Sequence, residues 1–163
     1  MRTHKPRAVW RIAAEAPDYG SDDLSGKGAE KSGGRWNRRG TPVIYASCSI
    51  ALAYLETIVH LSGLDPLPLN RYLIRIDIPG ADWKARTIFD AATHVGWDAL
   101  PAGLVSLNWG TQWLRSRRSL IAEVPSIVVP DEFNVLINPS HPGAAKLIAK
   151  KIRRWNYDAR YLT

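Results

Sequence analysis

The sequence has little of what disulfide-bonded and membrane-spanning proteins require. Cys48 is the single cysteine, so no disulfide can form within the chain and the fold does not depend on an oxidising compartment. No uninterrupted apolar run approaches the roughly 18 residues that a bilayer span requires, and the N-terminus has no signal-peptide core. These absences predict a soluble, cytoplasmic protein.

Histidine is also scarce. The four histidines lie at positions 4, 60, 94 and 141, and with one cysteine they offer no zinc-binding spacing. GxSxG, Walker and HExxH motifs are absent as well. We therefore expect no metal cofactor. His60 and His141 are candidates for an acid or a base, although isolated histidines are more often structural.

Acidic residues are outnumbered by basic ones. The 15 Asp and Glu stand against 22 Lys and Arg, which gives a net charge of +7. The basic excess gathers at residues 115–118 and 146–154. Such clusters are typical of a nucleic-acid surface, of a docking site for an acidic protein, or of solvated helix faces. The seven tryptophans are scattered along the chain, as core anchors are, rather than arrayed for base stacking.

What the chain does contain is a series of short apolar segments. Its length is typical of one domain, so we interpret residues 1–163 as a single domain with a flexible arm over residues 1–7. Strands are expected over residues 8–13, 42–45, 72–78, 119–129 in two pieces, 133–137 and, at an edge, 155–160. Helices are expected over residues 50–61, 106–115 (capped by Ser106) and 144–152. Residues 17–32 are predicted to be a functional loop, and residues 81–105 fit no pattern. The predicted fold class is α+β, because strands dominate and no βαβ repeat is present.

Residues 33–57 bring together the side chains best suited to chemistry. Two glycines precede Arg35 and permit a close approach to a ligand. Tyr45 ends a short strand, and a helix capped by Ser49 carries Glu56 among apolar residues, with His60 one turn later. A glutamate on a helix is usually a solvated surface residue, and an arginine in a glycine-rich loop is often only a turn residue. Spacing alone therefore assigns no function to this stretch.

Together with motifs elsewhere in the chain, this stretch resembles the RES domain family, the toxins of a class of bacterial toxin–antitoxin pairs. The resemblance covers most of the chain and rests on the order and spacing of seven motifs: Trp-Arg at 10–11, Ser-Gly-Lys-Gly-Ala at 25–29, Gly-Gly-Arg-Trp-Asn at 33–37, Ile-Tyr-Ala-Ser at 44–47, Ala-Leu-Ala-Tyr-Leu-Glu at 51–56, Val-Pro-Ser at 124–126 and Asn-Pro-Ser-His-Pro at 138–142.

The resemblance implies an ADP-ribosyltransferase-like fold, with mixed and mostly antiparallel sheets and a few flanking helices. This fold would bind NAD and cleave its nicotinamide–ribose bond. By the same resemblance, Glu56 stabilises the cationic ribose and Arg35 binds the phosphates. Tyr45 would stack on the nicotinamide, and Ser126 would hydrogen-bond the nicotinamide-ribose region.

The acceptor of the ADP-ribose group stays open at this point. Our first interpretation is a toxin that depletes NAD as a phosphorylase, with inorganic phosphate as co-substrate, or as a glycohydrolase, with water. The alternative is ADP-ribosylation of a cellular protein. A basic nucleic-acid-binding or RNA-cleaving domain and a non-catalytic NAD-binding module are the rival classes.

The family resemblance also implies a protein partner. This partner is an Xre-like helix-turn-helix antitoxin that would cover the NAD pocket. The toxin would contact DNA only through that antitoxin, and self-association of the toxin within the complex is expected.

Overall fold

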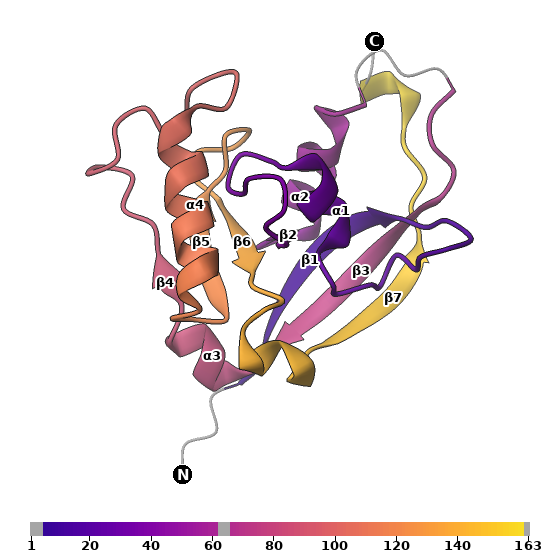
Figure 1. Cartoon of the computed structure of the whole chain (residues 1–163). Helices are drawn as coiled ribbons and strands as arrows, with labels where there is room; N and C mark the ends of the chain where they lie inside the picture. The colour runs from indigo at the N-terminus through magenta and orange to yellow at the C-terminus, as the bar shows by residue number, and fades with distance from the viewer. Residues whose placement is uncertain (1–4, 62–65, 162–163) are drawn as a thin grey trace.

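The computed structural model describes residues 5–61 and 66–161, and one seven-stranded sheet dominates this part of the chain (Figure 1). The strands are β1 Arg7–Ala14, β2 Ile44–Ser47, β3 Arg71–Ile78, β4 Thr87–Ile88, β5 Ile121–Pro125, β6 Phe133–Ile137 and β7 Ile148–Arg154. The α-helices are α1 Lys27–Ser32, α2 Ile50–Ile58, α3 Gly80–Lys84 and α4 Leu104–Ser116, and the 3-10 helices are η1 Pro142–Lys146 and η2 Ala159–Tyr161.

The sheet has the strand order β4-β5-β6-β2-β1-β3-β7. Every neighbouring pair is antiparallel except β4 with β5, so the prediction of an α+β fold with a mostly antiparallel sheet is confirmed. β1 pairs with β3 along its whole length, but it pairs with β2 only through Trp10 and Ser47. The sheet therefore splits between β1 and β2, near its middle.

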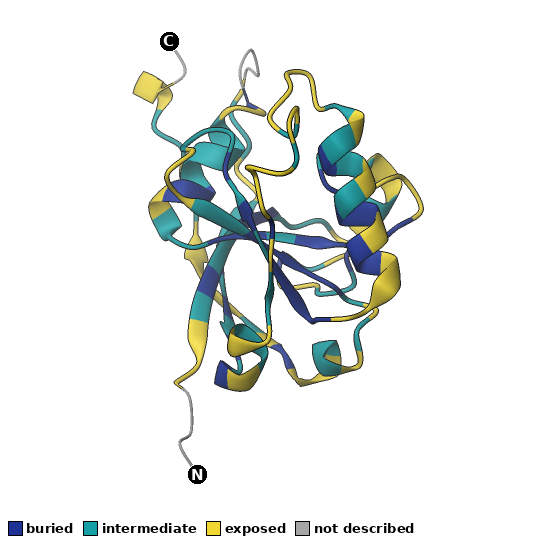
Figure 2. Ribbon diagram, turned by 90° about the vertical axis from the view of Figure 1, so that its left-hand side faces the viewer, coloured by how far each residue is buried: buried dark blue, intermediate teal, exposed yellow. Residues whose placement is uncertain are grey.

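Two helices cover different halves of one face of the sheet. Helices α4 and α2 lie over these two halves (Figures 1 and 2). Trp113 and Leu114 of α4 pack on β5 and β6, whereas Ala53 of α2 packs on β1 and β3. Helix α4 also lies very close to the backbone of the loop before β2. A Cβ atom at Gly110 of α4 would lie 2.0 Å from the carbonyl oxygen of Trp36 in that loop. Only glycine permits that approach. The split in the sheet lies between the two covered halves.

The opposite face of the sheet carries the largest apolar cluster, which stabilises the fold by removing branched side chains from water. Its buried members are Val9, Ala13, Ile44, Ala46, Ile74, Ile76, Ile78, Leu120, Ile121, Val135, Ile137 and Leu147. Along β1 and β3 these residues alternate with side chains of the other face, because successive side chains of a strand point to opposite sides of the sheet.

The predicted strands over residues 8–13, 42–45 and 72–78 correspond to β1, β2 and β3 with shifted ends, and the strand predicted over residues 133–137 has the same bounds as β6. The predicted helix over residues 50–61 ends earlier, at Ile58. Ser49 caps it as expected, since its side chain accepts a hydrogen bond from the backbone N–H of Leu52. Of the expected N-terminal arm, residues 1–4 lie outside the described residues, and Arg7 already belongs to β1.

Three predictions between residues 17 and 129 are wrong. The expected loop over residues 17–32 contains α1, which is too short to give a periodic pattern. Ser106 is not a cap, because α4 begins after Gly103 and Ser106 is buried inside the helix. The second strand piece expected after Pro125 is absent from the described chain: β5 ends at Pro125, and the following residues bend away.

The C-terminal prediction is also wrong. Residues 144–152 do not form a basic helix, because the chain makes the short η1 and then β7, which pairs with β3. Residues 155–160 do not form an edge strand, since β7 occupies that edge and η2 follows it. The basic side chains near the C-terminus therefore lie on an edge strand, where charge discourages pairing with another chain.

Candidate active site

A pocket of about 840 Å³ opens where β1 and β2 separate. Its walls come from β1, from residues 26–36 with β2, from α2 and from the segment that follows β5. Val59 and Leu100 line it with largely exposed side chains, 52% and 77%, so they mark its mouth. The volume falls in the range of small-molecule sites.

Glu56 enters this pocket from α2 and is half-buried. Its Oε1 atom accepts two hydrogen bonds, one from Ser126 Oγ at 2.7 Å and one from Asn134 Nδ2 at 2.6 Å. Both donors are neutral, so they orient the carboxylate without cancelling its charge. The structure thus brings together Glu56 and Ser126, two of the predicted site residues.

Ser126 is fully buried and lies just after β5 rather than within a strand. Its Oγ atom accepts hydrogen bonds from the backbone N–H groups of Val128 and Val129, both at 3.0 Å. The hydroxyl proton is therefore directed to Glu56. In this arrangement Ser126 serves the carboxylate, whereas the sequence interpretation had it bond the nicotinamide ribose.

Tyr45 lines the pocket from β2, and its hydroxyl group is fully engaged. It donates to Asn37 Oδ1 at 2.6 Å and accepts from the backbone N–H of Trp36 at 3.1 Å. A Cβ atom at Gly34 would come within 2.7 Å of this hydroxyl, so the second glycine of the motif makes room for it. Burial raises the pKa of Tyr45 far above its usual value, so the phenol stays neutral.

Arg35 also lines the pocket, but part of its guanidinium is already used. Its Nη1 atom donates to the backbone carbonyls of Trp97 and Ala99, each at 3.0 Å. Burial lowers the pKa of Arg35, while the charges of Asp98 and Glu56 oppose that shift. These contacts anchor residues 97–99 beside the pocket, in the segment that sequence reasoning left unassigned.

Arg11 is the pocket cation whose role sequence reasoning missed. It extends from β1, lines the pocket and makes no hydrogen bond or ion pair within residues 5–61 and 66–161. Burial lowers the pKa of Arg11, and the charge of nearby Asp23 acts in the opposite direction. A half-buried guanidinium without a partner is suited to an anionic ligand. Two features of the sequence pointed to it: a charged residue inside an apolar strand, and its place in the Trp-Arg motif at 10–11.

The two amides near the carboxylate and the tyrosine were missed as well. Asn134 lies on β6 and Asn37 in the loop after Arg35, and both sat in quoted segments without an assigned role. His60 lies in the turn after α2, where it lines the pocket with an exposed side chain. His141 caps η1 and is not among the residues that line the pocket.

Two features are absent from residues 5–61 and 66–161. No group of three or more His, Cys, Asp or Glu side chains in that part of the chain could hold a metal ion. No helix there has the length and apolar character needed to cross a membrane.

Comparison with known proteins agrees with the motifs. The RES domain family matches residues 8–160. A relative named Prs ADP-ribosylating toxin, from Sphingobium sp. (strain YBL2), is 49% identical over 156 residues, which are 95% of this chain and 96% of the relative. Toxin Res from Yersinia enterocolitica serotype O:8 / biotype 1B is 40% identical over 124 residues, 76% of this chain and 79% of the relative.

A solved structure shares the fold. A chain in the crystal structure of the M. tuberculosis MbcT–MbcA toxin–antitoxin complex superposes with a TM-score of 0.62, covering 93% of this chain and 86% of that one at 15% identity. Fold and pocket thus define an α+β protein whose large pocket is lined by the carboxylates of Asp23 and Glu56 and by the guanidinium groups of Arg11 and Arg35. More specifically, the chain belongs to the RES domain family, which confirms the resemblance seen in the sequence.

Proposed function

We propose that this chain is the toxin of a bacterial toxin–antitoxin pair and that it cleaves the bond between nicotinamide and ribose in NAD. The observation that supports this most is Glu56, a charged carboxylate held by two neutral donors in a pocket that also contains Arg11 and Arg35. The pocket thus offers a negative group for the reacting ribose and cations for the pyrophosphate.

Cleavage of this bond passes through an oxocarbenium-like transition state, in which positive charge develops on the ribose near C1′. Glu56 stabilises that charge and accepts a hydrogen bond from a ribose hydroxyl. Nicotinamide leaves with the electron pair of the broken bond as a neutral base, so no acid is needed. The acceptor then attacks C1′, and its proton is released to solvent through the mouth of the pocket.

Arg11 binds the pyrophosphate in this proposal, together with the N–H groups of Arg35 that the carbonyls of Trp97 and Ala99 leave free. Tyr45 presents its ring to the nicotinamide while Asn37 and Trp36 fix its hydroxyl. Ser126 acts by holding Glu56. No metal takes part.

One relative favours a protein as the acceptor in our proposal, because that relative, at 49% identity, is named as an ADP-ribosylating toxin. Inorganic phosphate and water remain the alternatives, and these would make the chain an NAD phosphorylase or a glycohydrolase. All three reactions share the cleavage step at Glu56 and differ only in the group that attacks the ribose.

The proposed partner is an Xre-like helix-turn-helix antitoxin, through which alone the complex would contact DNA. The structural neighbour comes from a toxin–antitoxin complex, and the exposed apolar side chains of Val59 and Leu100 offer a docking surface at the pocket mouth. Neutralisation would then be steric. Self-association within the complex and a cytoplasmic location belong to the same proposal.

The rival interpretation, a nucleic-acid surface, finds less support. The guanidinium of Arg153 covers the ring of Trp155 at 4.5 Å, and Lys151 Nζ lies 4.8 Å from the ring of Tyr72. These aromatic faces are occupied, so they are poor platforms for base stacking.

The acceptor is identified by product analysis. The purified chain is incubated with NAD alone, with inorganic phosphate, and with a protein extract of a growing bacterium. We expect nicotinamide release in every active mixture. Free ADP-ribose identifies a glycohydrolase, ADP-ribose 1″-phosphate a phosphorylase, and an ADP-ribosylated protein band a transferase. NAD that stays intact in all three mixtures contradicts the proposal.

Arg11→Met tests the assignment of the pyrophosphate cation. Methionine keeps an apolar stem of similar length but removes the charge, so we expect the KM for NAD to rise about 10- to 100-fold with a smaller change in kcat. Arg38→Met is the matched control, because Arg38 is exposed and does not line the pocket. An unchanged KM in Arg11→Met would remove Arg11 from the binding site.

A further inference from the structure

The hydrogen-bond network behind Glu56 extends one residue deeper than the carboxylate's own donors. Asn134 on β6 and Ser47 on β2 are direct partners in the antiparallel register of these strands. Ser47 Oγ donates to Asn134 Oδ1 at 2.8 Å, and Asn134 Nδ2 donates to Glu56 Oε1 at 2.6 Å. A continuous chain of hydrogen bonds therefore runs from the sheet to the carboxylate on α2.

Ser47 decides which way the Asn134 amide faces. A hydroxyl that donates to the amide oxygen holds that oxygen on the β2 side, so the NH₂ group must point toward α2. Ser126 is directed in the same way, because two backbone N–H groups occupy its lone pairs and leave only its proton for Glu56. Both donors are thus fixed by partners of their own.

Both donors converge on the same oxygen of Glu56. Oε1 receives Ser126 and Asn134, whereas Oε2 has no hydrogen bond from any residue within 5–61 and 66–161. The two donors therefore restrict rotation of the carboxylate and leave Oε2 available to a ligand. Asn134 is uncharged, so it orients the carboxylate of Glu56 without neutralising its negative charge. A Lys or Arg side chain in the same place would neutralise that charge.

We propose that Asn134, oriented by Ser47, is a positioning residue that fixes Glu56 so that Oε2 is the oxygen presented to the substrate ribose. The expected effect on kcat rests on the proposed cleavage of NAD. The hydrogen-bond geometry does not depend on that proposal. Asn134 exchanges no proton and touches no reacting atom in this role. A carboxylate free to rotate would meet the ribose in the reactive orientation only part of the time.

The kinetic test compares Asn134→Ala with wild type. We expect kcat for NAD cleavage to fall about 10- to 100-fold while the KM for NAD changes less than about twofold, since the residue acts on the transition state through Glu56. Ser47→Ala should give a smaller fall in kcat, because it removes only the hydrogen bond that orients the side-chain amide of Asn134. Equal losses in kcat and in binding, or an unchanged kcat, would overturn the assignment.

Asn138→Ala provides the matched control for a merely structural loss. Asn138 is also buried, and its amide bonds only backbone groups, donating to the carbonyl of Leu114 at 2.8 Å and accepting from the N–H of Ser140 at 3.0 Å. This variant should melt at a lower temperature yet keep its kcat at a temperature where it is folded. A fall in kcat equal to that of Asn134→Ala would identify the effect as general destabilisation.

A second measurement does not depend on turnover. In nitrogen-15 NMR spectra, the side-chain amide signals of Asn134 should shift strongly in Glu56→Ala, because the bonded proton loses its acceptor, while those of Asn138 stay in place. Unmoved Asn134 signals would contradict the contact itself. If the wild type fails to cleave NAD but the Asn134 signals shift, the proposed function fails and the geometry stands, so the two failures are distinguishable.

Discussion

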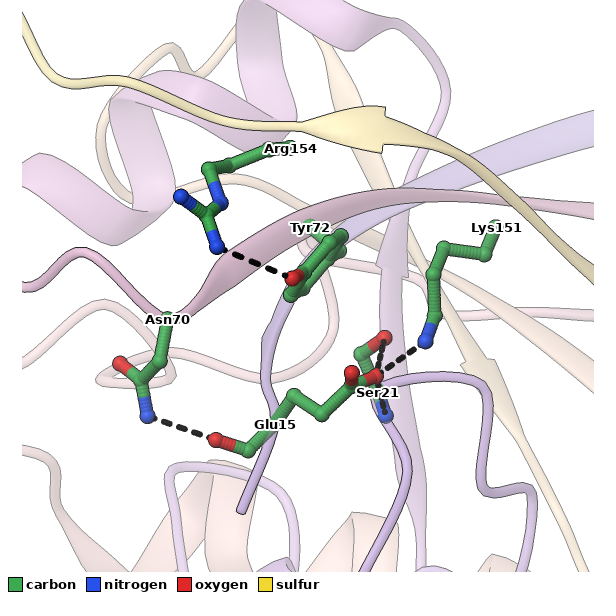
Figure 3. A network of polar contacts seen from close by, with 6 residues as sticks. All are labelled: Glu15, Ser21, Asn70, Tyr72, Lys151 and Arg154. Atoms are coloured by element: carbon green, nitrogen blue, oxygen red, sulfur yellow. Dashed lines mark hydrogen bonds and ion pairs between the residues drawn. The ribbon is translucent and has the colours of Figure 1, made fainter. Parts of the chain in front are cut away.

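Glu15 and Glu56 are both half-buried glutamates, but their carboxylates have different kinds of partner. Glu15 follows β1 near the β7 edge, where Lys151 forms an ion pair with it and Ser21 donates to it through both its hydroxyl and its backbone N–H (Figure 3). Glu56 has no such cation among its hydrogen-bond donors, since Ser126 and Asn134 are neutral. One carboxylate is neutralised, and the other keeps its charge available.

The partners of Glu15 change its titration. Chiefly the hydrogen bond from Lys151, and then those from Ser21, lower the pKa of Glu15 from 4.5 to about 2. Its backbone also joins the network, since its carbonyl accepts from Asn70 Nδ2 at 2.7 Å. Glu15 thus ties together the loop after β1 and the β7 edge through its carboxylate, and the segment before β3 through its backbone carbonyl. A charged pair of this kind holds a fold together, whereas a pocket carboxylate whose hydrogen-bond donors are neutral is suited to a reaction.

The largest expected difference between the two sites is in turnover. Glu56→Gln keeps the shape of the side chain but removes its charge, so NAD cleavage should fall by about a thousandfold. Glu15→Gln should leave NAD cleavage unchanged. Rates of nicotinamide release at matched protein concentration check both variants. Loss of activity in Glu15→Gln without loss of folding would break the distinction between the carboxylates.

The serines beside the two carboxylates form a second matched pair. Ser126→Ala should lower kcat about 10- to 100-fold, because Glu56 loses one of its two fixed donors. Ser21→Ala should reduce stability by about 1 kcal/mol, the value of one lost hydrogen bond, and leave kcat unchanged. Steady-state kinetics and urea unfolding of both variants provide the test. Equal kcat values would contradict the role given to Ser126.

The smallest effect concerns acid stability at Glu15. A carboxylate whose pKa is lowered on folding adds stability above its unfolded pKa of 4.5, and this contribution is lost as the pH falls through its folded pKa of about 2. Glu15→Gln should therefore melt at most a few degrees below wild type at pH 7, because exposed ion pairs contribute little. The difference should shrink as the pH approaches 2. A constant difference across this range would contradict the ion-pair account.

The sequence predicted the local parts of the site well. The glycines before Arg35, the cap at Ser49 and the helix that carries Glu56 depend on neighbours along the chain, and the structure has all three. Ser126 could be identified as a site residue from the family motif at residues 124–126, although the motif does not show which residue it contacts. The contact itself, across 70 residues, required the fold to bring the segment after β5 beside α2.

The parts that sequence reasoning missed depend on distant contacts. Asn134 is one polar residue in an apolar strand, and only its register with Ser47 gives it a role. The sequence predicts a short basic helix over residues 144–152. Instead, Ile148 and the residues after it pair with β3, since an edge strand can expose most of its side chains to water.

The central claim is that this pocket breaks the nicotinamide–ribose bond of NAD at Glu56. The most direct measurement is a time course of nicotinamide release from NAD by the purified chain, with water, phosphate or a bacterial protein extract as the acceptor. The same time course is recorded for the Glu56→Gln variant, after its melting temperature has been shown to equal that of the wild type. The account predicts one nicotinamide for each NAD consumed by the wild type and almost none from the variant. Intact NAD with every acceptor, or equal release by both proteins, would contradict it.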